Sequence, residues 1–169
     1  METLRNRAAL IKLFNRRGYR IGAEVGVFTG GFSSFILSTI ATSTLYSIDP
    51  WTGEGMSHEY DGDCLYSEAS AQLAEFGDRS IMIREYSDAA SIMFDDASLD
   101  FVYIDANHRY EYIRADIDLW LPKVRGGGVL SGHDYSRKQR CGVIQAVDES
   151  FGDRVNLTRG KAPSWWVNV

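Results

Sequence analysis

The stretch LDFVYIDANHRYEYIRADIDLWLPKVRGGGVLSGHDY, residues 99–135, indicates the fold class. Residues 99–106 form a short run that is apolar on both faces, as a buried parallel strand is. Residues 110–121 repeat apolar side chains at helical spacing, and residues 127–135 have the pattern of another strand. Two strands joined by a helix-length crossover predict a parallel β-α-β unit.

The same alternation continues on both sides of this unit. Strands are expected at 21–28, 44–50, 80–86, 155–159 and 164–169, and helices at 3–16, 31–41, 63–76, 88–94 and 138–151. The last two strands are separated by only four residues, too few for a crossover helix, so they should form an antiparallel hairpin. The predicted fold is α/β, with a doubly wound, mostly parallel, seven-stranded sheet that ends in an antiparallel C-terminal hairpin. Residues 1–169 are interpreted as one domain, with an N-terminal helix in 1–19 and the core in 20–169.

The composition is that of an ordinary globular protein. The 169 residues are 44% hydrophobic and 24% charged, which excludes intrinsic disorder and fits a single domain. The net charge of −5, from 18 basic and 23 acidic residues, disfavours nucleic acid as a partner. The two cysteines form no CxxC pair, and no apolar run approaches the ~20 residues that span a bilayer. We therefore expect a cytoplasmic protein without membrane contact.

A glycine-rich loop follows the first predicted strand, where open α/β sheets bind ligands. It contains EVGVFTGGFS (24–33), and its glycines permit positive φ and a close approach of a ligand to the backbone. The loop also opens a helix whose free N–H groups can bind a carboxylate or a phosphate. Its spacing lacks the dinucleotide fingerprint G-x-G-x-x-G. Taken alone, the glycines could equally serve tight packing of strand against helix.

Asp49 ends the second predicted strand, 23 residues after Gly26. A doubly wound fold places an acid there against the two ribose hydroxyls of a nucleoside. An Asp before Pro50 is also a common turn residue. The glycine loop and the acid together predict a nucleoside-type ligand.

Four segments carry a resemblance to a known family: AEVGVFTGGFSS, LYSIDPW, residues 101–135 and SWWVNV. They resemble class I S-adenosylmethionine-dependent methyltransferases, whose fold is Rossmann-like, and especially the compact branch called methyltransferase family 24, related to sugar and catechol O-methyltransferases. The likeness runs from about residue 20 to the end of the sequence. Its most specific part is the D-x-x-H-x-Y-E pattern that begins at Asp105, together with the later GG-V-x-x-G-H-D.

The resemblance implies that S-adenosylmethionine binds at the loops after the first four strands. The cofactor-binding residues would be Glu24, Gly26, Gly30, Asp49, Trp51, Ser87, Asp88 and Asp105. Glu24 and Gly26 would hold the amino-acid end, and Asp49 would bind the ribose hydroxyls. Ser87 and Asp88 would meet the edge of the adenine, while Trp51 and its neighbour would flank the adenosine.

The same resemblance implies methyl transfer to an oxygen of a small hydroxylated acceptor such as a sugar or a phenol. The reaction needs the acceptor oxygen aligned ~3–3.5 Å from the methyl carbon. A positioned base contributes a further ~10²–10⁴-fold. Asp105 and His108 are the candidate catalytic residues, because His108 stands where catechol-type relatives carry a catalytic lysine and its ordinary pKa of ~6.5 suits proton acceptance. His108 could instead cap the following helix.

A divalent metal is a further possibility. Metal-dependent relatives use a carboxylate after the fourth strand and an acidic or Asp-Asn pair after the fifth, and those positions are Asp105, His133 and Asp134 here. Carboxylates suit Mg²⁺, whereas imidazole is a softer ligand. The sequence leaves open Mg²⁺, Mn²⁺, or no metal with a hydrogen-bonding His133.

Two other readings compete with a methyltransferase. One is a nicotinamide-binding oxidoreductase domain, which the missing G-x-G-x-x-G and the terminal hairpin disfavour. The other is a module that binds S-adenosylmethionine without catalysis, since fold does not guarantee function. The chain has little room for a substrate cap beyond its N-terminal helix. Either a partner subunit, such as a second copy in a homo-oligomer, completes the pocket, or the acceptor is large.

Overall fold

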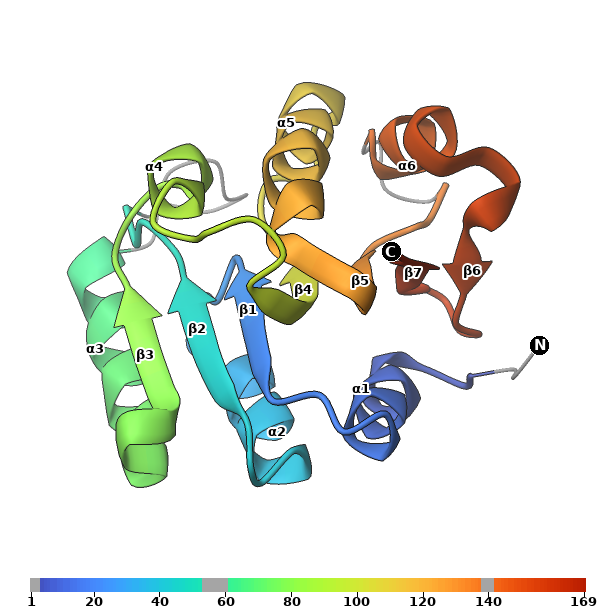
Figure 1. Ribbon diagram of the computed structural model, residues 1–169. Coiled ribbons are helices and arrows are strands. Elements are labelled where there is room, and N and C mark those ends of the chain that lie inside the picture. Colours follow the sequence, from blue (N-terminus) through green and yellow to red (C-terminus); the bar gives the residue numbers. More distant parts are fainter. Residues whose placement is uncertain (1–3, 53–60, 138–141) are drawn as a thin grey trace.

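A seven-stranded sheet with strand order β3-β2-β1-β4-β5-β7-β6 forms the centre of the molecule (Figure 1). The computed structural model describes residues 4–52, 61–137 and 142–169. The strands are β1 (Ile21–Val25), β2 (Thr44–Ile48), β3 (Ser80–Ile83), β4 (Leu99–Ile104), β5 (Val124–Gly132), β6 (Asn156–Leu157) and β7 (Trp165–Asn168). The first five pair in parallel, and β7 runs antiparallel to both β5 and β6. The predicted doubly wound sheet with an antiparallel C-terminal hairpin is confirmed.

Six α-helices in the described ranges cover the two faces of this sheet. They are α1 (Arg7–Arg16), α2 (Gly31–Thr39), α3 (Gly62–Leu73), α4 (Ser87–Ser91), α5 (Tyr110–Trp120) and α6 (Val143–Phe151). Short 3₁₀ turns follow three of them, η1 (Ala74–Arg79), η2 (Leu121–Lys123) and η3 (Gly152–Arg154). One apolar cluster joins α1, α2 and the end of α3 to the sheet, and another joins α4, α5 and α6 to its opposite face. In β4, Phe101 and Tyr103 enter the first cluster while Val102 and Ile104 enter the second, as the two-sided apolar pattern predicts.

Several element boundaries differ from the sequence prediction. The first helix begins at Arg7 rather than residue 3, because the Asn6 side chain caps it by accepting a hydrogen bond from the Ala9 N–H at 3.1 Å. The third strand ends at Ile83. The last helix begins at Val143, and part of its predicted range, residues 138–141, lies outside the described residues.

The fifth strand runs from Val124 to Gly132 rather than over 127–135, so it includes the whole glycine triplet at 126–128. The pairing of β4 with β5 changes register between Leu99 and Phe101, which marks a bulge. A side chain at Gly128 would lie 2.5 Å from the Asp100 carbonyl oxygen, so only glycine fits there. Across the described ranges, no helix has the length and apolar character needed to cross a membrane.

Candidate functional site

A cavity of about 730 Å³ opens at the carboxyl edge of the parallel strands. Its walls come from the loops after β1, β2, β3 and β4 and from one face of α5, and they include Gly26, Phe28, Asp49, Ser87, Asp88, Asp105 and Asp116. This is the position where doubly wound sheets bind their ligands. The volume fits one molecule the size of a nucleoside with an attached amino acid.

Gly26 lets the loops after β1 and β4 approach each other. Its φ is 92°, and an added Cβ would lie 2.3 Å from the Asp105 carbonyl oxygen. Close packing therefore requires glycine at this position, and Gly26 also lines the cavity. Gly30, with φ 85°, stands at the N-cap of α2 and does not line it.

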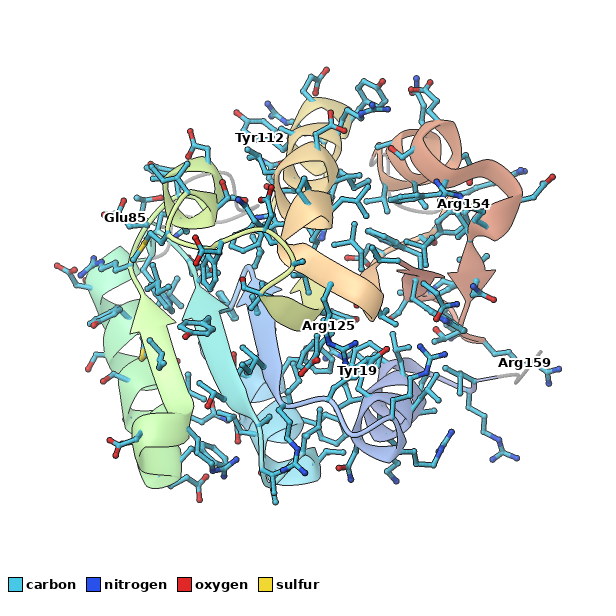
Figure 2. All side chains as sticks on the ribbon, viewed as in Figure 1. Tyr19, Glu85, Tyr112, Arg125, Arg154 and Arg159 are labelled. Atoms are coloured by element: carbon cyan, nitrogen blue, oxygen red, sulfur yellow. The ribbon has the colours of Figure 1, made fainter. Side chains whose placement is uncertain are left out.

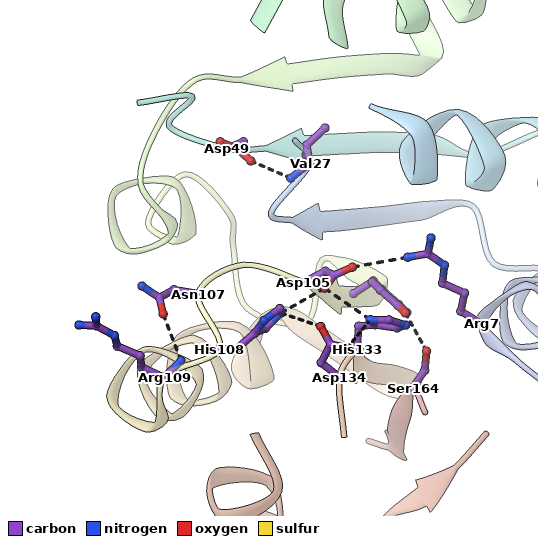
Figure 3. A network of polar contacts seen from close by, with 11 residues as sticks. Arg7, Val27, Asp49, Asp105, Asn107, His108, Arg109, His133, Asp134 and Ser164 are labelled. Carbon is purple, nitrogen blue, oxygen red and sulfur yellow. Dashed lines mark hydrogen bonds and ion pairs between the residues drawn. The ribbon is translucent and has the colours of Figure 1, made fainter. Parts of the chain in front are cut away.

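The Asp49 carboxylate organises the glycine loop. Its Oδ2 accepts a hydrogen bond from the backbone N–H of Val27 at 2.9 Å (Figure 3). The same oxygen accepts one from Phe28 N–H at 3.0 Å, and Oδ1 accepts one from Trp51 N–H at 2.8 Å. A carboxylate offers about four acceptor positions, so one remains for a ligand hydroxyl. Asp49 lines the cavity, as the prediction of a ribose-binding acid requires.

Trp51 and Glu24 lie behind the cavity wall rather than in it. Trp51 is buried against Tyr66, and its Nε1 donates to the Phe28 carbonyl at 2.7 Å. The Glu24 carboxylate is buried and accepts a hydrogen bond from the Ser33 hydroxyl, which also bonds Ser47 at 2.8 Å. Burial raises the pKa of Glu24 to about 8. Both residues shape the loops around the cavity, and direct contact with a ligand stays a prediction.

Ser87 and Asp88 begin α4 and line the cavity, and their contact with an adenine stays a prediction. The Ser87 hydroxyl donates to Asp116 Oδ1 at 2.5 Å and accepts from Trp120 Nε1 at 2.9 Å. It therefore faces α5. Sequence reasoning missed Asp116, although an acid between two isoleucines and a tryptophan on the inner face of a predicted helix is a visible signal.

Asp105, His108 and Asp134 meet at the end of β4 and β5. His108 Nε2 lies 3.3 Å from Asp105 Oδ1 and 3.3 Å from Asp134 Oδ2 (Figure 3). The hydrogen bond that His108 donates to Asp105 raises the pKa of His108 above its ordinary value, and the burial of His108 only partly opposes this. The two carboxylates therefore favour the imidazolium form.

Arg7 and His133 complete this corner. The Arg7 guanidinium reaches from α1 to within 3.6 Å of Asp105 Oδ2, and its Cζ lies 4.5 Å from the centroid of the Phe32 ring. His133 Nδ1 lies 3.2 Å from Asp134 Oδ1 and 3.8 Å from Asp105 Oδ1. Sequence reasoning did not single out Arg7, because the docking of α1 beside the site depends on tertiary packing.

The corner also has the donor set of a metal site. Ligand atoms of Asp105, His108 and Asp134 lie within 4.8 Å of one another. Two carboxylates and an imidazole fit a divalent ion such as Mn²⁺ better than Mg²⁺. The predicted set was Asp105, His133 and Asp134, and the structure brings His108 into the group while His133 remains beside it.

Strained backbone gathers at the same edge of the sheet. Phe28, Trp51 and Asp134 have φ values of 55°, 46° and 54°, although none is glycine. Such conformations cost about 1–3 kcal/mol each and persist where the surrounding structure holds them. Their position beside the cavity and the acidic corner supports a functional interpretation of this edge.

The sheet order, the reversed last strand and the glycine turn facing an acid on the second strand define a class I methyltransferase domain. Comparison with known families gives the same result. The chain belongs to the family described as the methyltransferase domain, which it matches over residues 23–135. The resemblance found in the sequence is confirmed.

Several known proteins are similar to this chain. An uncharacterised protein of Sinorhizobium fredii, y4gI, is 25% identical over 143 residues, which make up 84% of this chain and 16% of that protein. The chain therefore spans only a small part of that relative. An O-methyltransferase from Bacillus cereus, solved with S-adenosylhomocysteine, has a TM-score of 0.71 at 15% identity over 96% of this chain and 80% of its own. The Streptomyces achromogenes O-methyltransferase TomG, solved with S-adenosylmethionine, has a TM-score of 0.68 at 18% identity over 96% and 79% of the two chains.

Proposed function

We propose that this domain binds S-adenosylmethionine in the cavity and transfers its methyl group to an oxygen of a small hydroxylated acceptor, such as a sugar or a phenol. The observation that carries the proposal is that Asp105 lines the same cavity as Asp49 and lies 3.3 Å from His108, which itself stands just outside the cavity wall. Family membership and the two solved O-methyltransferases of the same fold support it.

In this reaction the bond from sulfur to the methyl carbon breaks and a bond from the acceptor oxygen to that carbon forms. Asp105 and His108 act on the acceptor side. A His108 that has lost its proton to solvent accepts the proton of the acceptor hydroxyl at Nε2, and the neighbouring carboxylates of Asp105 and Asp134 stabilise the imidazolium that results. Arg7 keeps Asp105 oriented through their 3.6 Å contact.

A divalent ion held by Asp105, His108 and Asp134 would lower the pKa of an acceptor hydroxyl by its charge. His108 could not then use Nε2 both as a ligand and as a base. Methyl transfer measured after treatment with EDTA, and after Mn²⁺ or Mg²⁺ is added back, separates the two arrangements. Unchanged activity in EDTA supports His108 as the base, and loss with recovery supports the ion.

The charge, the cavity and the cysteine content of the chain also bear on the acceptor and on the cellular compartment. The net charge of −5 disfavours nucleic acid as the acceptor. No residue of α1 (Arg7–Arg16) lines the cavity, so we infer that the acceptor, or a second copy of the chain, closes its outer side. We place the protein in the cytoplasm, since an exposed thiol such as that of Cys64 persists in a reducing compartment.

Calorimetric titration with S-adenosylhomocysteine tests the cofactor, and NADH serves as the competing ligand. We expect micromolar affinity for S-adenosylhomocysteine, no binding of NADH, and no binding of either ligand to Asp49→Ala. Transfer of labelled methyl to a panel of sugars and phenols tests the reaction. Binding of NADH alone favours an oxidoreductase domain, and binding without any transfer favours a non-catalytic module.

A further inference from the structure

Asp116 is an acid on the buried face of α5. The same face packs Ile113, Ile117 and Trp120 into the core, and Asp116 is only 5% exposed. Burial raises the pKa of Asp116 to about 6, which the hydrogen bond from Ser87 only partly opposes. An apolar residue would stabilise the helix more at this position. The acid is therefore a candidate for a role in binding.

Two neighbours fix the orientation of the Asp116 carboxylate. Ser87 donates to its Oδ1 at 2.5 Å, and Trp120 Nε1 donates to the Ser87 oxygen at 2.9 Å. The Ser87 proton is thus directed at Asp116 and away from the cavity. Within residues 4–52, 61–137 and 142–169, Ser87 is the only hydrogen-bond donor to Asp116. Its Oδ2 keeps its acceptor positions, and Asp116 lines the cavity.

The cavity around Asp116 suits a flat heteroaromatic ring. Ala115 and Leu119 of α5 line it with apolar atoms, and the aromatic side chains of Tyr86 and Tyr112 stand at its rim, each 53% exposed. Figure 2 shows Tyr112 on the outer part of α5 and Glu85 beyond the end of β3. A ring between these apolar side chains would present its edge to a single oriented carboxylate.

We propose that Asp116 Oδ2 accepts a hydrogen bond from the 6-amino group of adenine and thereby selects adenine over hypoxanthine. This inference rests on the proposed function, because it concerns the adenine of S-adenosylmethionine. Hypoxanthine carries a carbonyl oxygen at the same position. That oxygen would face the lone pairs of the carboxylate and leave a buried acceptor without a donor.

Affinities for S-adenosylhomocysteine and S-inosylhomocysteine, measured by calorimetry on the whole chain, test the inference. For the unmodified protein we expect the adenine ligand to bind about 10–100-fold more tightly, as for other hydrogen bonds to charged groups. In Asp116→Asn the amide oxygen can still accept from Ser87, which turns the NH₂ group toward the cavity. That variant should lose the preference for adenine or reverse it. Asp118→Asn, on the exposed face of the same helix, is the matched control and should keep it.

The outcomes separate this inference from the proposed function. If neither ligand binds the unmodified protein, the proposed function fails. If both bind with equal affinity, or if Asp116→Asn keeps the tenfold or greater preference, only the role of Asp116 is refuted. Loss of the preference in Asp88→Asn but not in Asp116→Asn would assign the amino group to Asp88 instead. If circular dichroism shows that Asp116→Asn does not fold, the same two affinities are measured with Asp116→Ser instead.

Discussion

The buried Glu24 carboxyl makes the stability of the protein depend on pH in a way that one substitution should remove. Burial raises the pKa of Glu24 from 4.5 to about 8, with Ser33 as its hydrogen-bond donor. The folded protein therefore keeps a proton that the unfolded chain releases as the pH rises above 4.5. The free energy of unfolding should fall as the pH rises from 4.5 to 8, because the folded state then binds more protons than the unfolded state.

The size of the effect follows from the two pKa values. The difference between about 8 and 4.5, at 1.36 kcal/mol per pH unit, corresponds to about 5 kcal/mol above pH 8 and about 3 kcal/mol at pH 7. Domains are stabilised by only about 5–15 kcal/mol in total, so this is a large fraction. Glu24→Gln keeps an oxygen that can accept from Ser33 and cannot ionise. We expect it to match the unmodified protein at pH 5 and to exceed its stability by several kcal/mol at pH 8.5.

Urea unfolding, followed by the fluorescence of the four tryptophans, measures both proteins at pH 5, 6, 7 and 8.5. Subtracting the free energy of unfolding of the unmodified protein from that of the variant at each pH cancels the contribution of all titratable groups that the two proteins share. Glu75→Gln, at an exposed position, is the control and should change stability equally at every pH. A stability difference for Glu24→Gln that stays constant from pH 5 to 8.5 would refute the argument.

Two further substitutions test the site. Gly26→Ala should lower stability by about 1–3 kcal/mol and weaken binding of S-adenosylhomocysteine, because its Cβ would lie 2.3 Å from the Asp105 carbonyl oxygen. Gly18→Ala is the control, because φ is also positive there (73°) but no atom lies within 4 Å of an added Cβ. It measures the backbone strain alone and should leave binding unchanged. Equal effects of the two substitutions on binding would contradict this reasoning. If no metal is needed, His108→Gln should reduce methyl transfer about 10²–10⁴-fold in assays with labelled cofactor while the affinity for S-adenosylhomocysteine is kept. Full activity of that variant would exclude His108 as the base.

Most of the fold could be predicted from local patterns, because the spacing of apolar residues within each segment matches the faces that the segment buries in the folded protein. The apolar run of β4 and the helical spacing of α5 identify both elements, and the short link before β7 correctly predicts antiparallel pairing. Of the boundaries that differ, the start of α1 has a local cause, the Asn6 cap, whereas the start of β5 has a tertiary one. The glycine triplet at 126–128 belongs to a strand because a bulge in the pairing of β4 with β5 accommodates it, and no local rule signals that register change.

The candidate site was predicted less completely than the fold. Asp49 was selected from its position at a strand end, and Asp105 and Asp134 were selected through the resemblance to known methyltransferases. All three lie at one edge because parallel strands bring their carboxyl ends together. The direction of each side chain could not be predicted. Glu24 occupies an expected position but faces α2, because alternate residues of a strand point to opposite faces of the sheet.

The position of β7 between β5 and β6 constrains the order in which the sheet can assemble. Strand β6 precedes β7 in the chain, yet β7 is its only partner in the sheet as described. Strand β6 therefore joins the sheet only through β7, either as part of a preformed hairpin or after β7 has docked on β5. Hydrogen exchange of the folded protein should accordingly show β6 among the least protected strands, because it is two residues long and pairs with one neighbour.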